Sequence, residues 1–300
     1  MLTPMNDLST AQAYETVNFT GVSGNPIAAD VYGQGGGRTV VLIHGGGQTR
    51  HSWRGTAERL AATGWTAITV DQRGHGDSAW IEGGDYSFRS FADDLVAVAD
   101  QITETYGARP VGIGASLGGI ASLLAEGESD RTVLSGVVLV DITPRVNRSG
   151  VEKILGFMAE RSDEGFASLE EAADAISAYL PHRKRPSDLT GLSKNLRLRD
   201  DGRYRWHWDP EFIKRRATGV SQEDHENRMI QASRQLTVPV LLVRGRQSEL
   251  VGEDVAREFL ELVPHADYAD VGDARHMVAG DKNDAFTDAV LEFLTKLTVD

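Results

Sequence analysis

Short apolar runs alternate with longer amphipathic segments along most of the chain. The runs are β-branched and apolar at consecutive positions, as expected of parallel strands covered by helices on both faces. Two earlier segments have a less regular pattern and predict an antiparallel edge, and a short strand is predicted just before the last helix. The predicted strands are residues 14–21, 26–32, 39–45, 66–74, 110–116, 135–144, 239–245 and 266–272.

Between these runs, apolar residues recur at the spacing of one helix face. One such series begins at Phe88, a second at Val255 and a third at Phe286. Strands that alternate with helices indicate an α/β fold with a mostly parallel sheet joined by right-handed crossovers.

The alternation of predicted strands and helices stops between Pro144 and Pro239. This interval contains no convincing buried strand and only helical signals. Ser168 with Glu171 forms a capping box before an amphipathic run. Asp209 followed by Pro210 predicts another helix start, with proline at the first helical position. We therefore expect a helical cap at 145–235, inserted into a core domain made of 1–144 and 236–300.

A serine lies in the sequence GASLG at 114–118, between a predicted strand and an apolar helix. This spacing fits a sharp strand-to-helix turn in which the flanking positions have no room for side chains. Ser116 would then lie at a helix N-terminus, whose free N–H groups favour developing negative charge. Ser116 is a candidate nucleophile, provided that a base takes its proton and donors hold the oxyanion.

Three motifs together resemble the α/β-hydrolase family: IHGGG at 43–47, DQRGHGDS at 71–78 and GIGASLGG at 112–119. The resemblance implies an eight-stranded, mostly parallel sheet with helices on both faces and an inserted helical cap. It also implies that the N–H groups of Gly46 and Leu117 form the oxyanion hole, with Gly47 the less favoured choice. His44, Arg73 and His75 are interpreted as structural residues.

The same resemblance points to His276 as the general base, because it follows the last predicted strand in GDARHMVAG. Arg275 occupies a position where the family often has glycine. Two carboxylates compete for the third place of the triad. Glu249 lies in the loop where the family usually carries the acid, whereas Asp141 ends the strand VVLVD, where some relatives carry it. We predict Glu249, with Asp141 as the alternative.

Composition narrows the class of partners and cofactors. The chain has 300 residues, a formal net charge of −13 and no cysteine. The acidic balance argues against nucleic-acid and membrane partners, and the lack of cysteine excludes disulfides and thiolate chemistry. The first twenty residues show no signal peptide, and no stretch is apolar enough to span a bilayer. We expect a cytoplasmic monomer or homodimer that needs no metal or cofactor.

The function predicted by the resemblance is a serine hydrolase of the carboxylesterase or lactonase type. It would cleave an apolar carboxylic ester or lactone through an acyl-enzyme, with Trp206 and Trp208 of the cap in the substrate-binding wall. Those two residues could equally pack the cap onto the core. A carbon–carbon bond hydrolase, a cofactor-free perhydrolase and a non-catalytic small-molecule-binding protein on the same fold are the alternatives. Epoxide hydrolase and haloalkane dehalogenase activities are disfavoured, because those members of the family need a carboxylate nucleophile and position 116 is serine.

Overall fold

Eight strands form one mixed sheet in a computed structural model that describes residues 14–33, 37–181, 185, 187–214, 221–281 and 283–297. The sheet order is β1-β2-β4-β3-β5-β6-β9-β10. Strand β2 is antiparallel to both of its neighbours, and every later pair is parallel. The predicted fold class is therefore confirmed. The strands are β1 Tyr14–Thr20, β2 Pro26–Tyr32, β3 Thr39–Ile43, β4 Thr66–Val70, β5 Val111–Ala115, β6 Gly136–Val140, β9 Val240–Gly245 and β10 Asp267–Val271.

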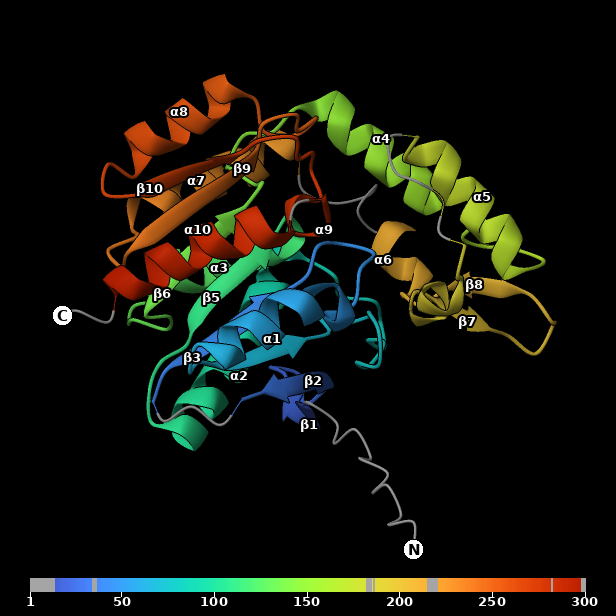
Figure 1. Ribbon diagram of the computed structural model, residues 1–300, viewed down its shortest axis with the longest axis horizontal. Coiled ribbons are helices and arrows are strands. Elements are labelled where there is room, and N and C mark those ends of the chain that lie inside the picture. The colour runs from blue at the N-terminus through green and yellow to red at the C-terminus, as the bar shows by residue number, and fades with distance from the viewer. Residues whose placement is uncertain are drawn as a thin grey trace, which may run out of the picture.

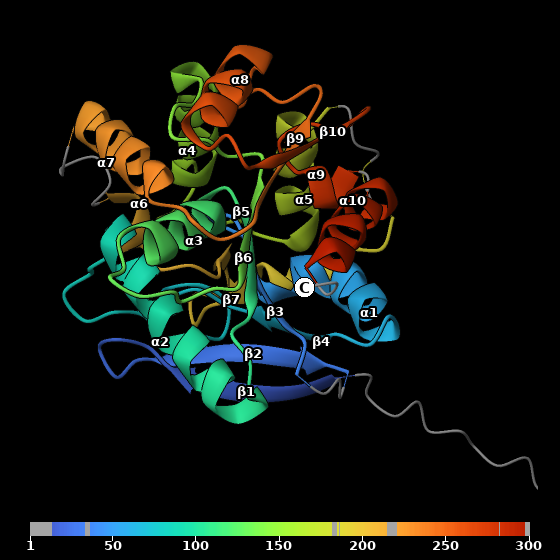
Figure 2. The same ribbon diagram turned by 90° about the vertical axis from the view of Figure 1, so that its left-hand side faces the viewer.

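Helices cover both faces of the sheet, so that its central strands are buried on each side (Figure 2). One face carries α1 (Arg54–Ala62) and α10 (Asn283–Lys296). The other carries α2 (Phe88–Tyr106), α3 (Leu117–Gly127), α7 (Gln222–Arg234) and α8 (Glu253–Leu262). Two short elements, η1 (Arg50–Trp53) and α9 (Val278–Asp281), complete this part of the chain.

The amphipathic pattern accounts for these helices. In α2 the predicted face is buried at Phe91, Leu95 and Val98. The helix begins where Ser87 Oγ accepts a hydrogen bond from the N–H of Ser90, and it ends at Gly107 with φ of 78°. No helix among the described residues is long and apolar enough to cross a bilayer.

Residues 145–235, here called the inserted segment, join β6 to β9. They contain α4 (Arg148–Ala159), α5 (Leu169–Tyr179), η2 (Thr190–Lys194), β7 (Leu196–Leu198), β8 (Tyr204–Trp206), α6 (Pro210–Lys214) and α7. Both predicted helix starts are confirmed, since α5 follows the N-cap Ser168 and α6 begins at Pro210. Figure 1 shows α4, α5, α6 and the β7–β8 pair together beyond one end of the sheet, whereas α7 lies against the core.

The β7–β8 hairpin is a departure from the helical expectation for this segment. Each strand has only three residues, and half of the six side chains are arginine or tyrosine. The alternation of apolar and polar residues is therefore too short to predict a strand. The turn was visible in the sequence as Asp201–Gly202, where Gly202 has φ of 76°. Asp-Gly is a strong hairpin signal, but only between strands of alternating apolar residues, and no regular apolar alternation flanks this turn.

Candidate active site

Ser116 occupies the sharp turn between β5 and α3. Its φ and ψ are 48° and −111°, a backbone conformation that side-chain-bearing residues rarely adopt. A Cβ on Gly114 would lie 2.2 Å from the carbonyl oxygen of Gly118, and a Cβ on Gly118 would lie 2.3 Å from that of Ile43. Both flanking positions therefore require glycine, as the sequence predicted. The strained turn places Ser116 at the N-terminus of α3, in the wall of a cavity.

Asp141 and His276 meet beside this turn. The Nδ1–H of His276 donates to Oδ2 of Asp141 over 2.8 Å. Asp141 follows β6, is fully buried and has φ of 50°, one of four positive φ values among the described non-glycine residues. Oδ1 accepts from the N–H of Gly245 at 3.1 Å, and Oδ2 also accepts from Ser248 Oγ at 2.5 Å. The carboxylate is thus fixed by three donors, one of which is the imidazole.

Glu249, the carboxylate predicted to face His276, contacts a different partner. The Nη1 of Arg275 donates to its Oε1 over 2.8 Å. Partial burial opposes ionisation of Glu249, but the hydrogen bond and the charge of Arg275 hold its pKa below the usual value. Among the described residues, Asp141, the alternative, is the carboxylate hydrogen-bonded to His276, whereas Glu249, the predicted acid, is paired with Arg275. Arg275, at the position where the family often has glycine, supplies the competing cation.

The glycine loop after β3 keeps one N–H group unengaged. The N–H of Gly45 donates to Gln48 Oε1, and that of Gly47 donates to His75 Nε2, each over 3.1 Å. Within the described residues, the N–H of Gly46 has no hydrogen-bond partner, nor has that of Leu117 at the start of α3. A Cβ on Gly46 would lie 3.9 Å from Leu117 Cδ2, so the two residues are neighbours. These contacts favour Gly46 over Gly47 as an oxyanion donor.

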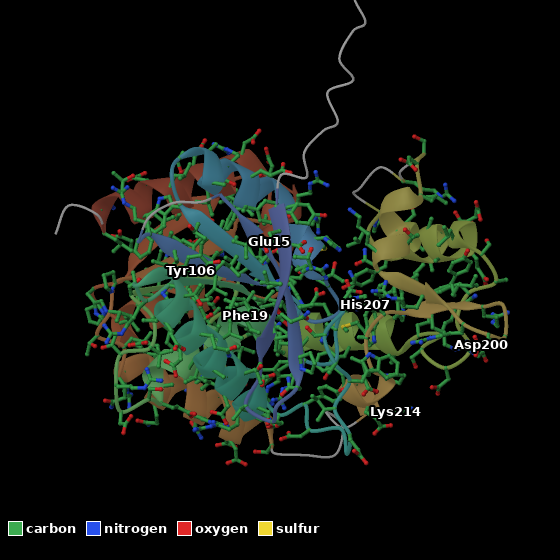
Figure 3. The ribbon with its side chains drawn as sticks, turned by 90° about the horizontal axis from the view of Figure 1, so that it is seen from below. Glu15, Phe19, Tyr106, Asp200, His207 and Lys214 are labelled. Atoms are coloured by element: carbon green, nitrogen blue, oxygen red, sulfur yellow. The ribbon has the colours of Figure 1, made fainter. Side chains whose placement is uncertain are left out.

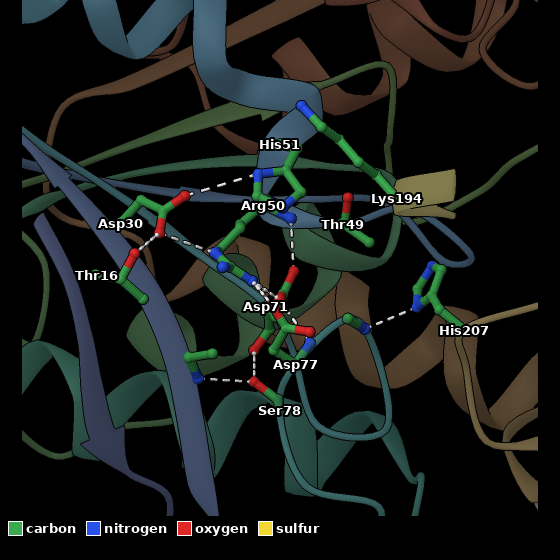
Figure 4. Close-up of polar contacts among 12 residues, drawn as sticks. Thr16, Asp30, Thr49, Arg50, His51, Asp71, Asp77, Ser78, Lys194 and His207 are labelled. Atoms are coloured by element: carbon green, nitrogen blue, oxygen red, sulfur yellow. Dashed lines mark hydrogen bonds and ion pairs between the residues drawn. The ribbon is translucent and has the colours of Figure 1, made fainter. Parts of the chain in front are cut away.

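The loop 71–78 is held by an ion-pair network centred on the buried Arg50 (Figure 4). Arg50 reaches Asp30 at 3.1 Å, Asp71 at 2.5 Å and Asp77 at 2.8 Å. Arg73 makes a two-bond pair with Asp94, each bond 2.7 Å long, which agrees with its structural interpretation. No cluster of three or more metal-ligating side chains occurs in the part of the chain that the structure describes.

A match to the profile described as the alpha/beta hydrolase fold covers residues 38–282. The chain belongs to the α/β-hydrolase family. Its relatives include the esterase Rv0045c of Mycobacterium tuberculosis, 30% identical over 75% of this chain and 72% of that protein. They also include 2-(acetamidomethylene)succinate hydrolase of Mesorhizobium japonicum, 28% identical over 84% and 86%. A crystal structure of Rv0045c superposes with a TM-score of 0.72 at 27% identity, covering 98% of this chain and all of that one.

The cavity of this α/β-hydrolase lies between the sheet and the inserted segment and has a volume of about 1260 Å³. Ser116, Leu117, Gly46 and His276 line it from the core side. Trp206 and Trp208 line it from the other side, and their rings are stacked with centroids 4.8 Å apart. Both indoles are also buried, at 6% and 4% exposure, so they pack the segment and form a wall at once.

Two contacts in the hydrolase were missed by sequence reasoning. The first is the hydrogen bond from Ser248 to Asp141. Ser248 precedes Glu249, a carboxylate at the family's usual acid position, and the sequence pattern therefore favours the glutamate as the functional residue of this loop. His207 reaches the glycine loop from the inserted segment: its Nε2–H donates to the carbonyl oxygen of Gly47 over 3.3 Å. The available signal for this second contact was the alternation of side chains along 206–208. In extended backbone, His207 points to the side opposite the indoles of Trp206 and Trp208.

Buried neutral histidines lie behind the glycine loop of the hydrolase. Burial lowers the pKa of His44 to about 4. Burial, and then the neighbouring His75 and His44, lower the pKa of His207 well below its usual value. An unfolded histidine binds a proton near pH 6.5. As the pH falls from 6.5 toward 4, the unfolded chain therefore takes up protons that the folded chain does not, and folding stability is lost.

We expect the free energy of unfolding to fall by about 2 kcal/mol between pH 8 and pH 5 from His44 alone, with His207 adding in the same direction. Urea unfolding at a series of pH values measures it. Carboxylates serve as an internal control, because the stability they contribute is lost at lower pH. Arg228 lowers the pKa of Glu128, so the stability gained from ionised Glu128 is lost only as the pH falls below the ordinary value of 4.5. An unchanged unfolding midpoint from pH 8 to pH 5 would contradict the neutral, buried state of these histidines.

Proposed function

We propose that the protein is a serine esterase that hydrolyses a carboxylic ester or lactone through an acyl-enzyme intermediate. The observation that carries this proposal is the hydrogen bond from His276 to the buried, strained Asp141, in the same cavity wall as Ser116 on its strained turn. A fixed carboxylate selects the imidazole tautomer with the proton on Nδ1, which leaves Nε2 able to accept a proton from serine.

In the proposed first half-reaction, Ser116 Oγ bonds to the substrate carbonyl carbon while His276 Nε2 takes the hydroxyl proton. The carbonyl oxygen becomes an oxyanion that accepts hydrogen bonds from the N–H groups of Gly46 and Leu117. When the carbon–oxygen bond to the alcohol breaks, His276 returns the proton to the departing oxygen. Asp141, in place of Glu249, stabilises the imidazolium between these two transfers.

In the second half-reaction, a water molecule attacks the acyl carbon and gives its proton to His276 Nε2. The oxyanion forms again, and its collapse releases the carboxylic acid as Ser116 Oγ recovers the proton. Each of the two steps has a lower barrier than direct attack by water on the ester. In a lactone the alcohol and acid remain one molecule, so the same steps give a hydroxy acid.

The cavity supports an apolar substrate of medium size. Its wall includes the stacked indoles of Trp206 and Trp208 and a second stacked pair, Phe157 and Tyr179, with centroids 4.1 Å apart. Aromatic surfaces of this kind hold acyl chains or rings by apolar burial. We propose that the inserted segment acts as a cap that selects the acyl group, and the esterase among the relatives supports an ester as the scissile group.

A fluorophosphonate probe tests the proposal directly. Ser116 Oγ should bond to phosphorus as fluoride leaves and His276 takes the proton, and peptide mass spectrometry should find the adduct on 112–119. The same enzyme should hydrolyse p-nitrophenyl esters of graded acyl length. An unlabelled protein that hydrolyses no activated ester or lactone, but binds such compounds, would instead support a non-catalytic binding protein.

Two further assays separate the remaining alternatives that share a serine, histidine and acid. A carbon–carbon bond hydrolase would cleave vinylogous diketones faster than esters. A cofactor-free perhydrolase would form peracid from a carboxylic acid and hydrogen peroxide. We expect ester or lactone cleavage to exceed both, and the opposite ranking would replace the esterase proposal.

A further inference from the structure

Two histidines from different parts of the chain hold the two polar groups of Gly47. His75, in the loop after β4, accepts the N–H of Gly47 on its Nε2 at 3.1 Å. His207, which follows β8 in the inserted segment, donates its Nε2–H to the carbonyl oxygen of Gly47 at 3.3 Å. With the N–H of Gly45 held by Gln48, the glycine loop is fixed on both sides of Gly46.

The backbone partners of each ring determine where its proton lies. The N–H of Gly76 donates to His207 Nδ1 over 2.7 Å, so that nitrogen carries no proton and Nε2 does. His75 donates its Nδ1–H to the carbonyl oxygen of Arg73 over 2.9 Å, so its Nε2 carries no proton and accepts from Gly47. Both rings are almost fully buried, at 0% and 1% exposure. A neutral imidazole has one donor and one acceptor, and here each is matched to a backbone group.

Packing around the rings limits their movement. The centroids of His75 and His207 are 5.8 Å apart, and Phe212 of α6 packs edge-on against His75 at 4.7 Å. Phe212 also approaches the glycine loop, since a Cβ on Gly46 would lie 3.3 Å from its Cζ. Figure 3 shows His207 on the side of the inserted segment that faces the core, with Asp200 at the far tip.

We propose that His207 is a positioning residue for the oxyanion hole: from the inserted segment it fixes Gly47, and so keeps the N–H of Gly46 available to the carbonyl oxygen that develops charge. This inference rests on the proposed function. It assigns the inserted segment a part in transition-state stabilisation, in addition to its part in forming the cavity wall. The energetic reason is that an oxyanion donor contributes most when it needs no reorganisation during the reaction.

Two substitutions separate the two hydrogen bonds of His207. The amide oxygen of His207→Asn can take the place of Nδ1 and accept from Gly76, but nothing remains at the Nε2 position. The amide nitrogen of His207→Gln can reach the Nε2 position and donate to Gly47. We expect H207N to lower kcat for an activated ester about tenfold with KM within twofold, a fraction of the 10²–10³ lost with an oxyanion donor itself. We expect H207Q to recover most of the loss.

A trifluoromethyl ketone gives a second readout that packing alone would not move. Ser116 Oγ adds to its carbonyl carbon, the proton goes to His276, and the resulting hemiketal oxyanion lies in the oxyanion hole. H207N should weaken this inhibitor about as much as it lowers kcat, while H207Q should bind it nearly as tightly as the wild type. The inhibition constant therefore follows stabilisation of the oxyanion, not substrate affinity.

Arg197→Ala is the matched control for docking of the inserted segment. Arg197 reaches Asp77 at 2.9 Å and the carbonyl oxygen of Gly76 at 3.3 Å, and within the described residues it makes no hydrogen bond to Gly47. R197A should keep kcat and inhibitor affinity near the wild-type values. Equal losses in R197A and H207N, or in H207Q and H207N, would overturn the proposal and reduce His207 to a packing residue.

Folding and function failures are distinguishable in this design. If H207N does not fold, a tenfold lower kcat in folded H207Q would itself overturn the proposal, and near-wild-type kcat and inhibitor affinity would support it. If neither variant folds, His207 is a folding residue and the proposal is overturned.

Failure of the proposed function gives a different result. A wild type that neither hydrolyses esters nor reacts with a fluorophosphonate would overturn the proposed function itself. An active wild type with unaffected His207 variants would remove this inference alone.

Discussion

Replacing Asp141 with asparagine is expected to lower kcat for ester hydrolysis about 10⁴-fold. The introduced side-chain amide cannot carry the negative charge that stabilises the imidazolium. Its NH₂ group facing Nδ1 would also favour the tautomer with the proton on Nε2, which cannot accept a proton from Ser116. Asparagine tolerates a positive φ well, so the backbone at φ of 50° should survive the change. Steady-state kinetics with a p-nitrophenyl ester measure the loss, and circular dichroism checks the fold.

Glu249→Gln is the matched comparison, because it neutralises the other carboxylate without changing side-chain size. It removes a half-exposed ion pair with Arg275, and such pairs contribute about 0–1 kcal/mol. We expect kcat to fall by no more than about fivefold. A loss in E249Q that matches or exceeds that of D141N would return the acid to position 249 and refute the assignment made here.

Replacing Ser116 with alanine is expected to lower kcat by about 10⁵–10⁶-fold. Alanine lacks the attacking oxygen, so no acyl-enzyme forms and only binding and the oxyanion donors remain to assist water. Alanine and serine both carry a Cβ, so the backbone strain at φ of 48° is the same in both and the folded structure should persist. Ester hydrolysis and fluorophosphonate labelling should disappear together.

Ser135→Ala controls for the loss of a hydroxyl group. Ser135 is exposed, and its Oγ donates to the carbonyl oxygen of Arg109 just before β5, at the opposite end of that strand from Ser116. This variant should retain both turnover and labelling. If S116A keeps more than about one hundredth of the wild-type kcat, the nucleophile is elsewhere and the acyl-enzyme mechanism is wrong.

The strands and long helices could be predicted because burial leaves a periodic signal in the sequence. Strand β5 is apolar on both faces since helices cover both, and α2 repeats its apolar residues at helical spacing. The β7–β8 pair left no such signal. Its strands are too short for alternation to be recognised, and Leu198 is 61% exposed although it is apolar.

The choice between two acids could not be made from the sequence for a geometric reason. Strands β6 and β9 are parallel neighbours, so the residues that follow them lie at the same edge of the sheet. Asp141 and Glu249 both start from this edge, and chain order allows either one. The decision depends on where the β9 loop directs its polar groups. Its Ser248 hydroxyl and the N–H of Gly245 point to Asp141, and Arg275 takes the carboxylate of Glu249.

The sheet order has a consequence for how activity arises during folding. The glycine loop follows β3, Ser116 follows β5, Asp141 follows β6 and His276 follows β10, so the proposed machinery spans non-adjacent stretches of the chain. Contacts between segments far apart in sequence form late, because closing long loops costs entropy before any contact compensates. A partly folded or nascent chain would hold a strained serine turn without its base. Ester turnover is consequently a stringent reporter of complete assembly of the native sheet, more so than any signal from secondary structure.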